Sequence, residues 1–553
     1  MANFKFHYLV LAGVILLGGL LRFWHLDLKP LWLDEAITAL FALGRNYNDV
    51  PLDTLFPLQQ LPQIFNFKTG LTCPQIAQNI ATQSTHPPLF FCLIHGWMQT
   101  PLVGVMSRGL VWSLRSLPAL FGVGAIAAMY WLNTIAFSRA AGLLAAALIA
   151  VSPFAVYLSQ EARHYTLPVL LIALSLVGLI RIQQVFFAHN KGNHALVLIG
   201  WISVNIVGFY THYFFILAFA AQVVTLCVLM YWRRDRVSRS SVVAIALSIL
   251  VVIASFIPWL PIVASHFNRS ETSWLPAPQH IAPIYQTLVS WVLMLVALPV
   301  ENQPWWIAIV AGLIMLLFSI WITPQIWRGF KNLWRSPATQ SSTITLFTFT
   351  TVVLLEFLAI VYFLGKDITI APRYNFVYYP AFCALVAASL VTRQTSRWKY
   401  KSQAIVLLLG LLSCVFVVSN FVFQKPFNPQ QVAQNLNFEP TMPLVVVVGY
   451  ETYQDVALGL SFALALEKIR SQDYTTSFGF FERSPYESVW QKLAASPPPS
   501  TTTVNLWVVA PGLKRRDYPP QLAYANQSCN LDATQHYRIG VPYQLYRCRR
   551  GEG

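Results

Sequence analysis

Hydrophobic residues gather into runs along the first 422 positions, and short polar segments separate these runs. A run of about 20 residues crosses the ~30 Å hydrocarbon core of a bilayer as one helix. The pattern therefore predicts a polytopic α-helical membrane protein with about eleven spans. They lie roughly at residues 7–22, 110–136, 140–158, 165–182, 195–211, 213–231, 241–261, 304–323, 343–364, 375–392 and 403–422.

Lysine and arginine orient these spans. Basic clusters that begin at residues 138, 181, 233, 327 and 393 occupy every second turn-around, as expected for cytoplasmic loops. Two further apolar stretches, 86–104 and 284–300, would each invert this alternation if counted alone as a span, so they are predicted to be interfacial or re-entrant helices on the outer side. The alternation predicts a cytoplasmic N-terminus and places the residues after 422 outside the cytoplasm.

The C-terminal residues 423–553 predict a small α/β domain that follows a membrane domain of residues 1–422. Residues 443–470 indicate a buried strand followed by an amphipathic helix, and residues 504–512 indicate a second buried strand. Cys529 and Cys548 lie in this domain, where a disulfide and two free thiols both stay open. The other five cysteines have no metal-ligand spacing and are interpreted as small apolar residues.

Composition excludes an ordinary soluble protein. Of the 553 residues, 56% are hydrophobic and 10% are charged, with a formal net charge of +16, whereas about a quarter of the residues of a soluble domain are charged. The positive excess lies in short clusters between apolar runs, which favours anchoring at the inner leaflet over nucleic-acid binding. The N-terminal run lacks an A-x-A cleavage pattern and is interpreted as a retained first span.

Asp34 and Glu35 form an acidic pair in the predicted outer loop of residues 23–109. The helix macrodipole would favour such acids at a helix start. Their neighbours are apolar, however, and a carboxylate against apolar surface is costly unless it is partnered or functional. Partial burial also raises a carboxyl pKa towards values that suit proton transfer. A catalytic role is therefore the favoured interpretation.

Arg163 and Arg373 lie at predicted outer ends of spans, where cytoplasmic anchoring does not explain them. A guanidinium binds phosphate through two parallel hydrogen bonds, so two outer arginines suit a lipid phosphate. Anchoring of Arg163 and Tyr165 at the interface, or an ion pair between Glu161 and Arg163, are the alternatives.

Histidines near these outer ends raise the question of a metal. His86 and His212 are as compatible with satisfied polar groups as with function. A divalent metal is weakly indicated and not required, because the candidate ligands are far apart in the sequence: His86, His212 or His266 with Asp34 or Glu35. Without a G-x-G-x-x-G, P-loop or G-x-S-x-G pattern, no nucleotide cofactor is indicated either.

Several motifs occur in a recognisable order: the acidic pair, "THPPLFFCLIHGW", "SQEARHYTL", "YTHYF" and "APRYNFVYYPAF". This order resembles the GT-C fold glycosyltransferases of family 39, which include protein O-mannosyltransferases, the lipid A aminoarabinose transferase and rhizobial-type lipopolysaccharide sugar transferases. The resemblance covers roughly residues 1–400 and no motif of the C-terminal domain.

The resemblance implies an enzyme of the bacterial inner membrane that moves a sugar, with inversion, from a polyprenyl-phosphate donor to a lipid, glycan or protein acceptor on the periplasmic face. Asp34 would act as the general base or orient the acceptor, with Glu35 as the second acid of the pair. The donor phosphate would be bound by Arg163, Arg373, Tyr374 and His212. Other substrate contacts would come from His86, Glu161, His164 and Tyr165.

The chemistry of the residues agrees with this expectation. A departing phosphate develops charge that needs fixed cations, and the attacking hydroxyl needs a carboxylate to accept its proton. In the family that the sequence resembles, the position of His86 carries either this His-Pro-Pro or a Glu-Lys-Pro sequence, so the resemblance implies no glutamate or lysine role at this position.

A transporter or flippase of lipid-linked sugars with an outer accessory domain is the alternative. Such a protein should show charged residues near mid-bilayer and repeated halves. Glu356 is one candidate for a mid-span acid, but the sequence shows no internal repeat. The enzyme is therefore favoured.

Overall fold

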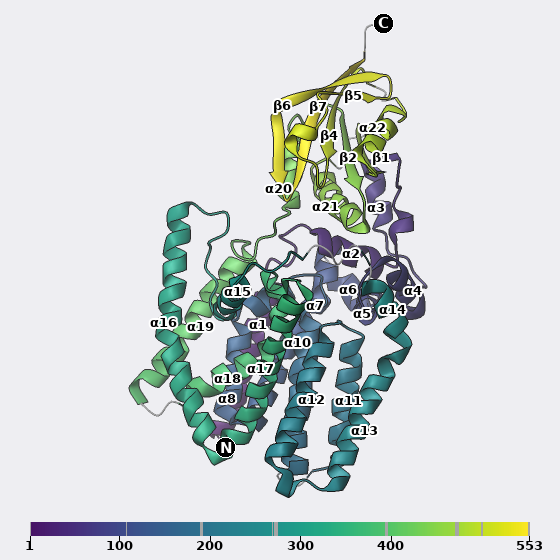
Figure 1. Ribbon diagram of the computed structural model, residues 1–553. Helices are drawn as coiled ribbons and strands as arrows, with labels where there is room; N and C mark the ends of the chain where they lie inside the picture. Colours follow the sequence, from purple (N-terminus) through teal and green to yellow (C-terminus); the bar gives the residue numbers. More distant parts are fainter. Residues whose placement is uncertain are drawn as a thin grey trace. The chain divides into compact units, whose positions relative to one another are not determined.

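The computed structural model describes residues 2–106, 108–187, 192–267, 269, 275–392, 396–470, 475–498 and 501–550. The chain forms two compact units (Figure 1). The first unit comprises Met1–Leu26, Thr85–Leu93 and Thr100–Phe423, and the second comprises Asp27–Ser84, Ile94–Gln99 and Gln424–Gly553. Much of the predicted outer loop thus folds with the C-terminal segment. The predicted division of the chain into two domains at residue 422 does not include this exchange.

The first unit is a bundle of apolar helices. Among the described residues, eight helices are long and apolar enough to cross a membrane, and the pair α8 and α9, bent by 58°, gives a ninth if it counts as one span. The helices are α1 (Ala2–Phe23), α5 (Leu89–Met98, of which the first half belongs here), α6 (Pro101–Met106), α7 (Leu110–Ala136), α8 (Arg139–Ala150), α9 (Pro153–Ser159), α10 (Thr166–Ile182), α11 (His194–Phe209), α12 (Phe215–Trp232), α13 (Arg239–Phe256), α14 (Leu260–Phe267), α15 (Ala282–Leu293), α16 (Trp305–Arg335), α17 (Pro337–Leu364), α18 (Tyr379–Val391) and α19 (Ser396–Val418).

The helices confirm the predicted polytopic α-helical class. The shorter apolar helices α11 and α18 occupy the remaining two predicted spans, and the total of eleven stays a prediction. The stretches 86–104 and 284–300, which were predicted not to span, contain only α5, α6 and α15, each of 12 residues or fewer. The basic cluster that begins at residue 393 falls outside the described residues.

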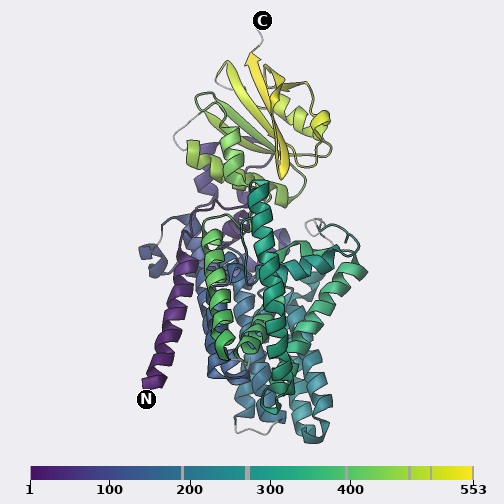
Figure 2. The ribbon, with the colours of Figure 1, turned by 90° about the vertical axis from the view of Figure 1, so that its left-hand side faces the viewer.

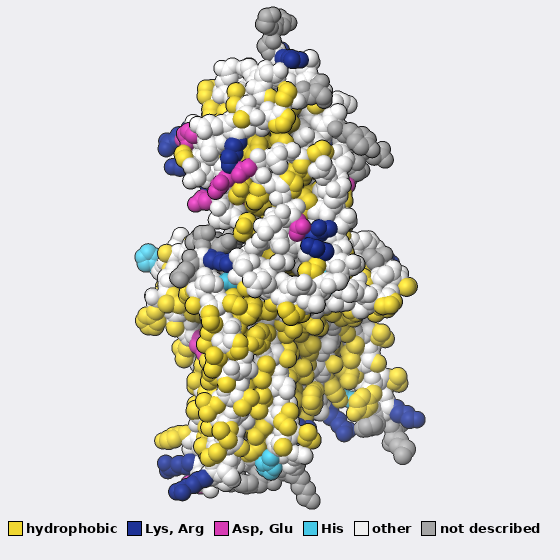
Figure 3. Space-filling view, turned by 90° about the vertical axis from the view of Figure 1, so that its right-hand side faces the viewer, with side chains coloured by type: hydrophobic (Ala, Val, Ile, Leu, Met, Phe, Trp, Pro, Cys, Tyr) yellow, Lys and Arg dark blue, Asp and Glu magenta, His cyan; other side chains and the backbone are white. Residues whose placement is uncertain are grey.

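The periphery of this unit has the surface that a bilayer requires. Only 17% of the apolar window of α1, and 17% of that of α16, is buried; Figure 2 shows α16 at the front of the unit and α1 at its edge. In Figure 3, hydrophobic side chains cover the visible face of the long helices, and basic side chains gather near helix ends. Such a continuous apolar surface suits hydrocarbon and not water.

Polar side chains inside the bundle bond to one another. Trp201 of α11 donates its indole N–H to Gln222 of α12 at 2.7 Å. Gln222 donates to the Asn205 amide oxygen at 3.0 Å, and Asn205 donates to the Trp201 carbonyl at 2.8 Å. This closed network joins α11 and α12 without an unsatisfied amide, which is what a water-free interior demands.

The second unit is an α/β domain with a seven-stranded sheet of order β1-β3-β2-β4-β7-β6-β5 (Figure 1). Strands β3, β2 and β4 run parallel, and the other neighbours pair antiparallel. The strands are β1 (Leu55–Pro57), β2 (Leu444–Tyr450), β3 (Thr476–Glu482), β4 (Thr503–Val509), β5 (Gln521–Tyr524), β6 (Gln527–Ile539) and β7 (Val541–Arg550); the helices are α2 (Leu33–Ala42), α3 (Leu61–Ile64), α4 (Cys73–Gln83), α20 (Pro429–Leu436), α21 (Tyr453–Arg470) and α22 (Tyr486–Ala494).

Alternation along β2 explains how both sheet faces are buried. Val445 and Val447 join a core that includes Val489 and Leu493 of α22. Val448, the residue after Val447, faces the opposite side, where Gly459 of α21 allows close contact. A continuous apolar strand is the expected sequence for a parallel strand covered on both faces, so the strand-then-helix prediction for residues 443–470 and the strand prediction for 504–512 are confirmed.

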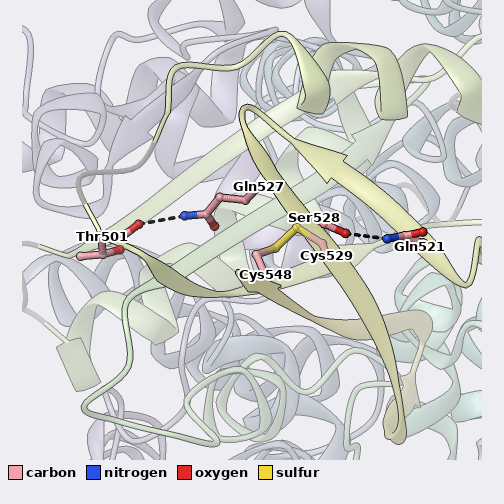
Figure 4. The surroundings of a disulfide bond; sticks show 6 residues. All are labelled: Thr501, Gln521, Gln527, Ser528, Cys529 and Cys548. Carbon is pink, nitrogen blue, oxygen red and sulfur yellow. Dashed lines mark hydrogen bonds between the residues drawn. A yellow bond between two sulfur atoms is a disulfide. The ribbon is translucent and has the colours of Figure 1, made fainter. Parts of the chain in front are cut away.

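Two cysteines of the second unit form a disulfide, which decides between the bonded and the free state that the sequence left open. Cys529 of β6 and Cys548 of β7 are directly opposite residues in the antiparallel pair and form a disulfide, with their Cα atoms 3.8 Å apart (Figure 4). Cys73 and Cys92 are also disulfide-bonded. The interpretation of these two as apolar fillers is therefore wrong, because spacing along the chain does not reveal which thiols meet in space.

We expect Gly329 of α16 to be essential for helix packing. A Cβ atom at Gly329 would collide with the Ser389 carbonyl of α18, whereas nothing lies within 4 Å of a Cβ at Gly312 of the same helix. Gly329→Ala should destabilise the protein by about 1–3 kcal/mol. Gly312→Ala should be neutral or stabilise by up to about 1 kcal/mol through helix propensity. Thermal unfolding in detergent compares the two variants; equal melting temperatures would contradict the packing role.

Candidate functional site

A cluster of buried and half-buried arginines and histidines lies in the first unit. It consists of His86, Arg163, His164, His212 and Arg373, hereafter the arginine–histidine cluster. These residues come from segments that precede α5, join α9 to α10, join α11 to α12, and join α17 to α18. Four segments far apart in the sequence therefore supply one site.

The contact between Arg163 and His86 defines the protonation of the histidine. Arg163 Nη2 lies 3.1 Å from His86 Nε2. A guanidinium can only donate hydrogen bonds, so His86 accepts through Nε2 and carries its proton on Nδ1. Arg163 is buried, whereas His86 is partly exposed. The pair thus combines a fixed positive charge with a neutral imidazole.

His164 lies between two other imidazoles. Its ring centroid is 5.0 Å from that of His86 and 4.5 Å from that of His212. His212 Nδ1 accepts a hydrogen bond from the Phe214 backbone N–H at 3.0 Å, which leaves the His212 proton on Nε2. Within the described chain, His164 Nδ1 is buried and makes no hydrogen bond, so one polar atom of the cluster is available to a ligand.

Electrostatics keep these histidines neutral. Burial lowers the pKa of His86, His164 and His212 well below the ordinary value of 6.5, and the positive charge of Arg163 and Arg373 acts in the same direction. The fixed charge of the cluster near neutral pH is therefore that of the two guanidinium groups.

Aromatic rings complete the surroundings of the arginines. The Arg163 guanidinium carbon lies 5.8 Å from the centroid of the Tyr165 ring, and that of Arg373 lies 5.5 Å from the Tyr374 ring. Phe376, which the sequence did not single out, lies 4.8 Å from His212 and 6.0 Å from Tyr165, measured between ring centroids. Glu161 is buried in the α9–α10 segment.

A neighbouring group that includes Tyr213 was not predicted as part of the site. Tyr213 accepts from the Trp259 indole N–H at 3.1 Å and its hydroxyl lies 2.8 Å from His266 Nδ1. Burial raises the pKa of Tyr213 to about 12, so it stays protonated and can donate to His266. The sequence signalled His266 only as a distant metal candidate, because tertiary contacts alone bring it beside Tyr213.

The predicted acids lie in the second unit, at the N-terminus of α2. Glu35 is buried, and its Oε2 is 3.5 Å from the Trp32 backbone N–H, as in a capping box. Asp34 is partly exposed, and its carbonyl accepts from the Thr38 hydroxyl at 3.1 Å. Lys425 Nζ lies 4.2 Å from the centroid of the Trp32 ring. Glu35 is therefore placed to stabilise the first turn of α2, and Asp34 is the more exposed of the two acids.

No metal centre emerges from the described residues: among them, no three His, Cys, Asp or Glu side chains are grouped to hold an ion. The arginine–histidine cluster instead places positively charged guanidinium groups beside neutral imidazole rings that can form hydrogen bonds. This combination suits an anion with several oxygen atoms.

Fold and sequence together define a polytopic membrane protein with the GT-C glycosyltransferase fold, the class that the sequence resemblance predicted. ArnT from Cupriavidus metallidurans in the apo state aligns over 99% of this chain and 98% of its own, with a TM-score of 0.56 and 11% identity. ArnT bound to undecaprenyl phosphate aligns over 98% of both chains, with a TM-score of 0.53 and 11% identity. Neither a protein-family model nor a curated protein sequence matches this chain.

Because the three histidines of the cluster are neutral, we expect the folded protein to lose stability at acidic pH. Their pKa values in the folded state lie below the value of about 6.5 in the unfolded state. Below about pH 6.5 the unfolded chain therefore binds more protons than the folded protein. The folded protein loses stability as the pH falls through this range. Three such groups give a slope of up to about 4 kcal/mol per pH unit. Thermal unfolding of the full chain between about pH 5 and 8 measures this slope.

A matched pair of variants separates the cluster from other histidines. His164→Gln should remove about one third of the slope, because one of three excluded protons is lost. His280→Asn, at an exposed position, should leave the slope unchanged. A melting temperature that is flat down to about pH 5 would contradict the neutral-histidine assignment.

Proposed function

We propose that this chain is a membrane glycosyltransferase that moves a sugar, with inversion, from a polyprenyl-phosphate donor to an acceptor on the outer face of a membrane. The observation that carries this proposal is the arginine–histidine cluster: one buried and one half-buried guanidinium group beside neutral imidazoles, from four separate segments, in a protein of GT-C fold. Undecaprenyl phosphate is the ligand of the similar ArnT structure.

The donor phosphate is assigned to the cluster on the basis of charge. Breaking the bond from sugar to phosphate moves an electron pair onto a phosphate oxygen, and fixed cations stabilise that developing charge without proton transfer. Arg163 and Arg373 supply the cations, with Tyr374 and His212 beside them. His86, His164, Tyr165 and Glu161 are assigned to other substrate contacts. The Nε2 proton of His212 can donate to a phosphate oxygen without adding charge.

The base is assigned to Asp34. A carboxylate that accepts the proton of the attacking hydroxyl must be accessible, and Asp34 is the partly exposed acid of the pair, whereas Glu35 is buried at the start of α2. Glu35 is then a positioning residue that holds the first turn of α2. One carboxylate suffices, because the phosphate leaves without needing a proton donor.

Charge and cysteine chemistry support the outer location. One span-length stretch of helix separates each segment of the cluster from the nearest described basic turn-around, so the two sets lie at opposite ends of the helices. By the positive-inside rule the basic end is cytoplasmic. The Cys529–Cys548 disulfide favours an oxidising compartment for the second unit, as in a periplasm.

Asp34→Asn should abolish transfer. Loss of a general base lowers the rate by about 10²–10⁴-fold, while an isosteric amide keeps the fold. The assay incubates the purified protein in liposomes with a panel of polyprenyl-phosphate sugars and cell-envelope extract, with mass analysis of the products. Asp27→Asn, an exposed acid in the same segment, is the control that should transfer like the parent. Parental transfer by Asp34→Asn would show that another group takes the proton.

Arg163→Gln and Arg373→Gln should weaken donor binding more than stability. Each removes charge-assisted hydrogen bonds to phosphate, which corresponds to an affinity loss of about 10-fold or more. Binding of undecaprenyl phosphate to the purified variants measures the effect. Arg181→Gln alters an exposed arginine at the other end of α10 and should bind like the parent. Unchanged binding in both cluster variants would remove the phosphate assignment.

A further inference from the structure

A small cavity in the first unit is lined by a buried arginine that belongs to no part of the proposed active site. Residues of α1, α7, α8, α9, α10 and α18 form its walls, and the polar ones are Arg22, Ser159, Thr166 and Tyr379. The volume of the cavity is ≈ 10 Å³.

Arg22 bonds only to neutral groups. Its Nη1 donates to the carbonyls of Gly18 at 2.8 Å and Ala150 at 3.2 Å, and its Nη2 donates to that of Ile149 at 2.9 Å. The last two carbonyls end α8, just before the bend to α9, so the arginine satisfies acceptors that the broken helix leaves open. Across the described chain, no carboxylate lies within ion-pair distance of this fully buried guanidinium.

Three potential donors line the cavity. Arg22 Nε and Thr166 Oγ1 are buried and make no hydrogen bond within the described chain, and the buried Tyr379 OH lies near the Ser152 hydroxyl and the Cys383 thiol. They reach the same cavity from α1, α10 and α18. A positive charge and two hydroxyl groups that converge on one space form a site of donors, and such a site favours a negative ligand over a neutral one.

We propose that this cavity binds one small monovalent anion of the size and chemistry of chloride. The anion accepts from Arg22 Nε and from the two hydroxyls, and it balances a charge that would otherwise stay uncompensated inside the bundle. A cavity of this volume holds about one water molecule, so the slightly larger chloride ion requires a small outward shift of the lining side chains. Charge distinguishes the ion from a water molecule.

Gly122 of α7 keeps the space open. A Cβ atom at this position would lie 2.8 Å from Arg22 Nε and would collide with the Ser159 hydroxyl. A glycine that lets a neighbouring helix approach is common in membrane bundles. Here it also leaves the Nε edge of the guanidinium facing a cavity rather than a side chain.

The test uses the full-length protein in detergent, dialysed into sodium gluconate. Titration with sodium chloride at constant ionic strength should raise the melting temperature by several degrees and saturate, because the ion binds only the folded state. Radioactive chloride should bind at close to one ion per chain. Absence of chloride binding together with equal melting temperatures in the two salts would show that the cavity holds only water and would overturn the proposal.

Variants locate the bound ion. Thr166→Val and Tyr379→Phe each remove one donor with little change in volume and should weaken chloride binding by about 10-fold. The matched control is Thr350→Val, because the Thr350 hydroxyl, also buried in a span, donates at 2.8 Å to the Leu346 carbonyl of its own helix. This control should bind chloride like the parent. Parental chloride affinity in both cavity variants would place the ion elsewhere and overturn the proposal.

Discussion

The helical unit depends on one constraint: a polar group in its interior has no water to bond and must be satisfied by the protein itself. The closed network of Trp201, Asn205 and Gln222 meets this constraint between α11 and α12. Arg22 meets it by bonding carbonyls at the end of α8, where the bend to α9 interrupts the helical ladder. The same demand makes buried charge rare, so buried guanidinium groups are where the molecule departs from a simple apolar bundle.

The constraint also decides the state of the arginine–histidine cluster. Burial already disfavours a second charge beside Arg163 and Arg373, and it lowers the pKa of the three histidines for the same reason. Protonated histidines would repel the arginines. Neutral imidazoles can instead fill the space with oriented N–H groups and lone pairs. The cluster then carries two fixed positive charges, which under the proposed function match a doubly charged phosphate.

Periodicity and charge allowed much of the fold to be predicted. Apolar runs of span length, a valine-rich buried strand and the helix after it are local patterns, so the helices and the β2–α21 unit followed from them. Features that depend on distant contacts were not accessible. Strand β1 has three residues and exists because it pairs with β3 more than 400 positions later. Two further cases of this kind are the disulfide-bonded state of Cys73 and Cys92 and the contact of His266 with Tyr213.

The site likewise combines residues that local patterns predicted with an arrangement that depends on distant contacts. The motifs named nearly every residue of the arginine–histidine cluster, because outer arginines and histidines stand out against the positive-inside pattern. They did not show that the acidic pair belongs to the second unit, where α2 packs against α21 of the C-terminal segment. The chain passes between the two units five times. Which distant segments pack together decides such a division of the chain, and hydrophobic periodicity, which is a local pattern, does not carry that information.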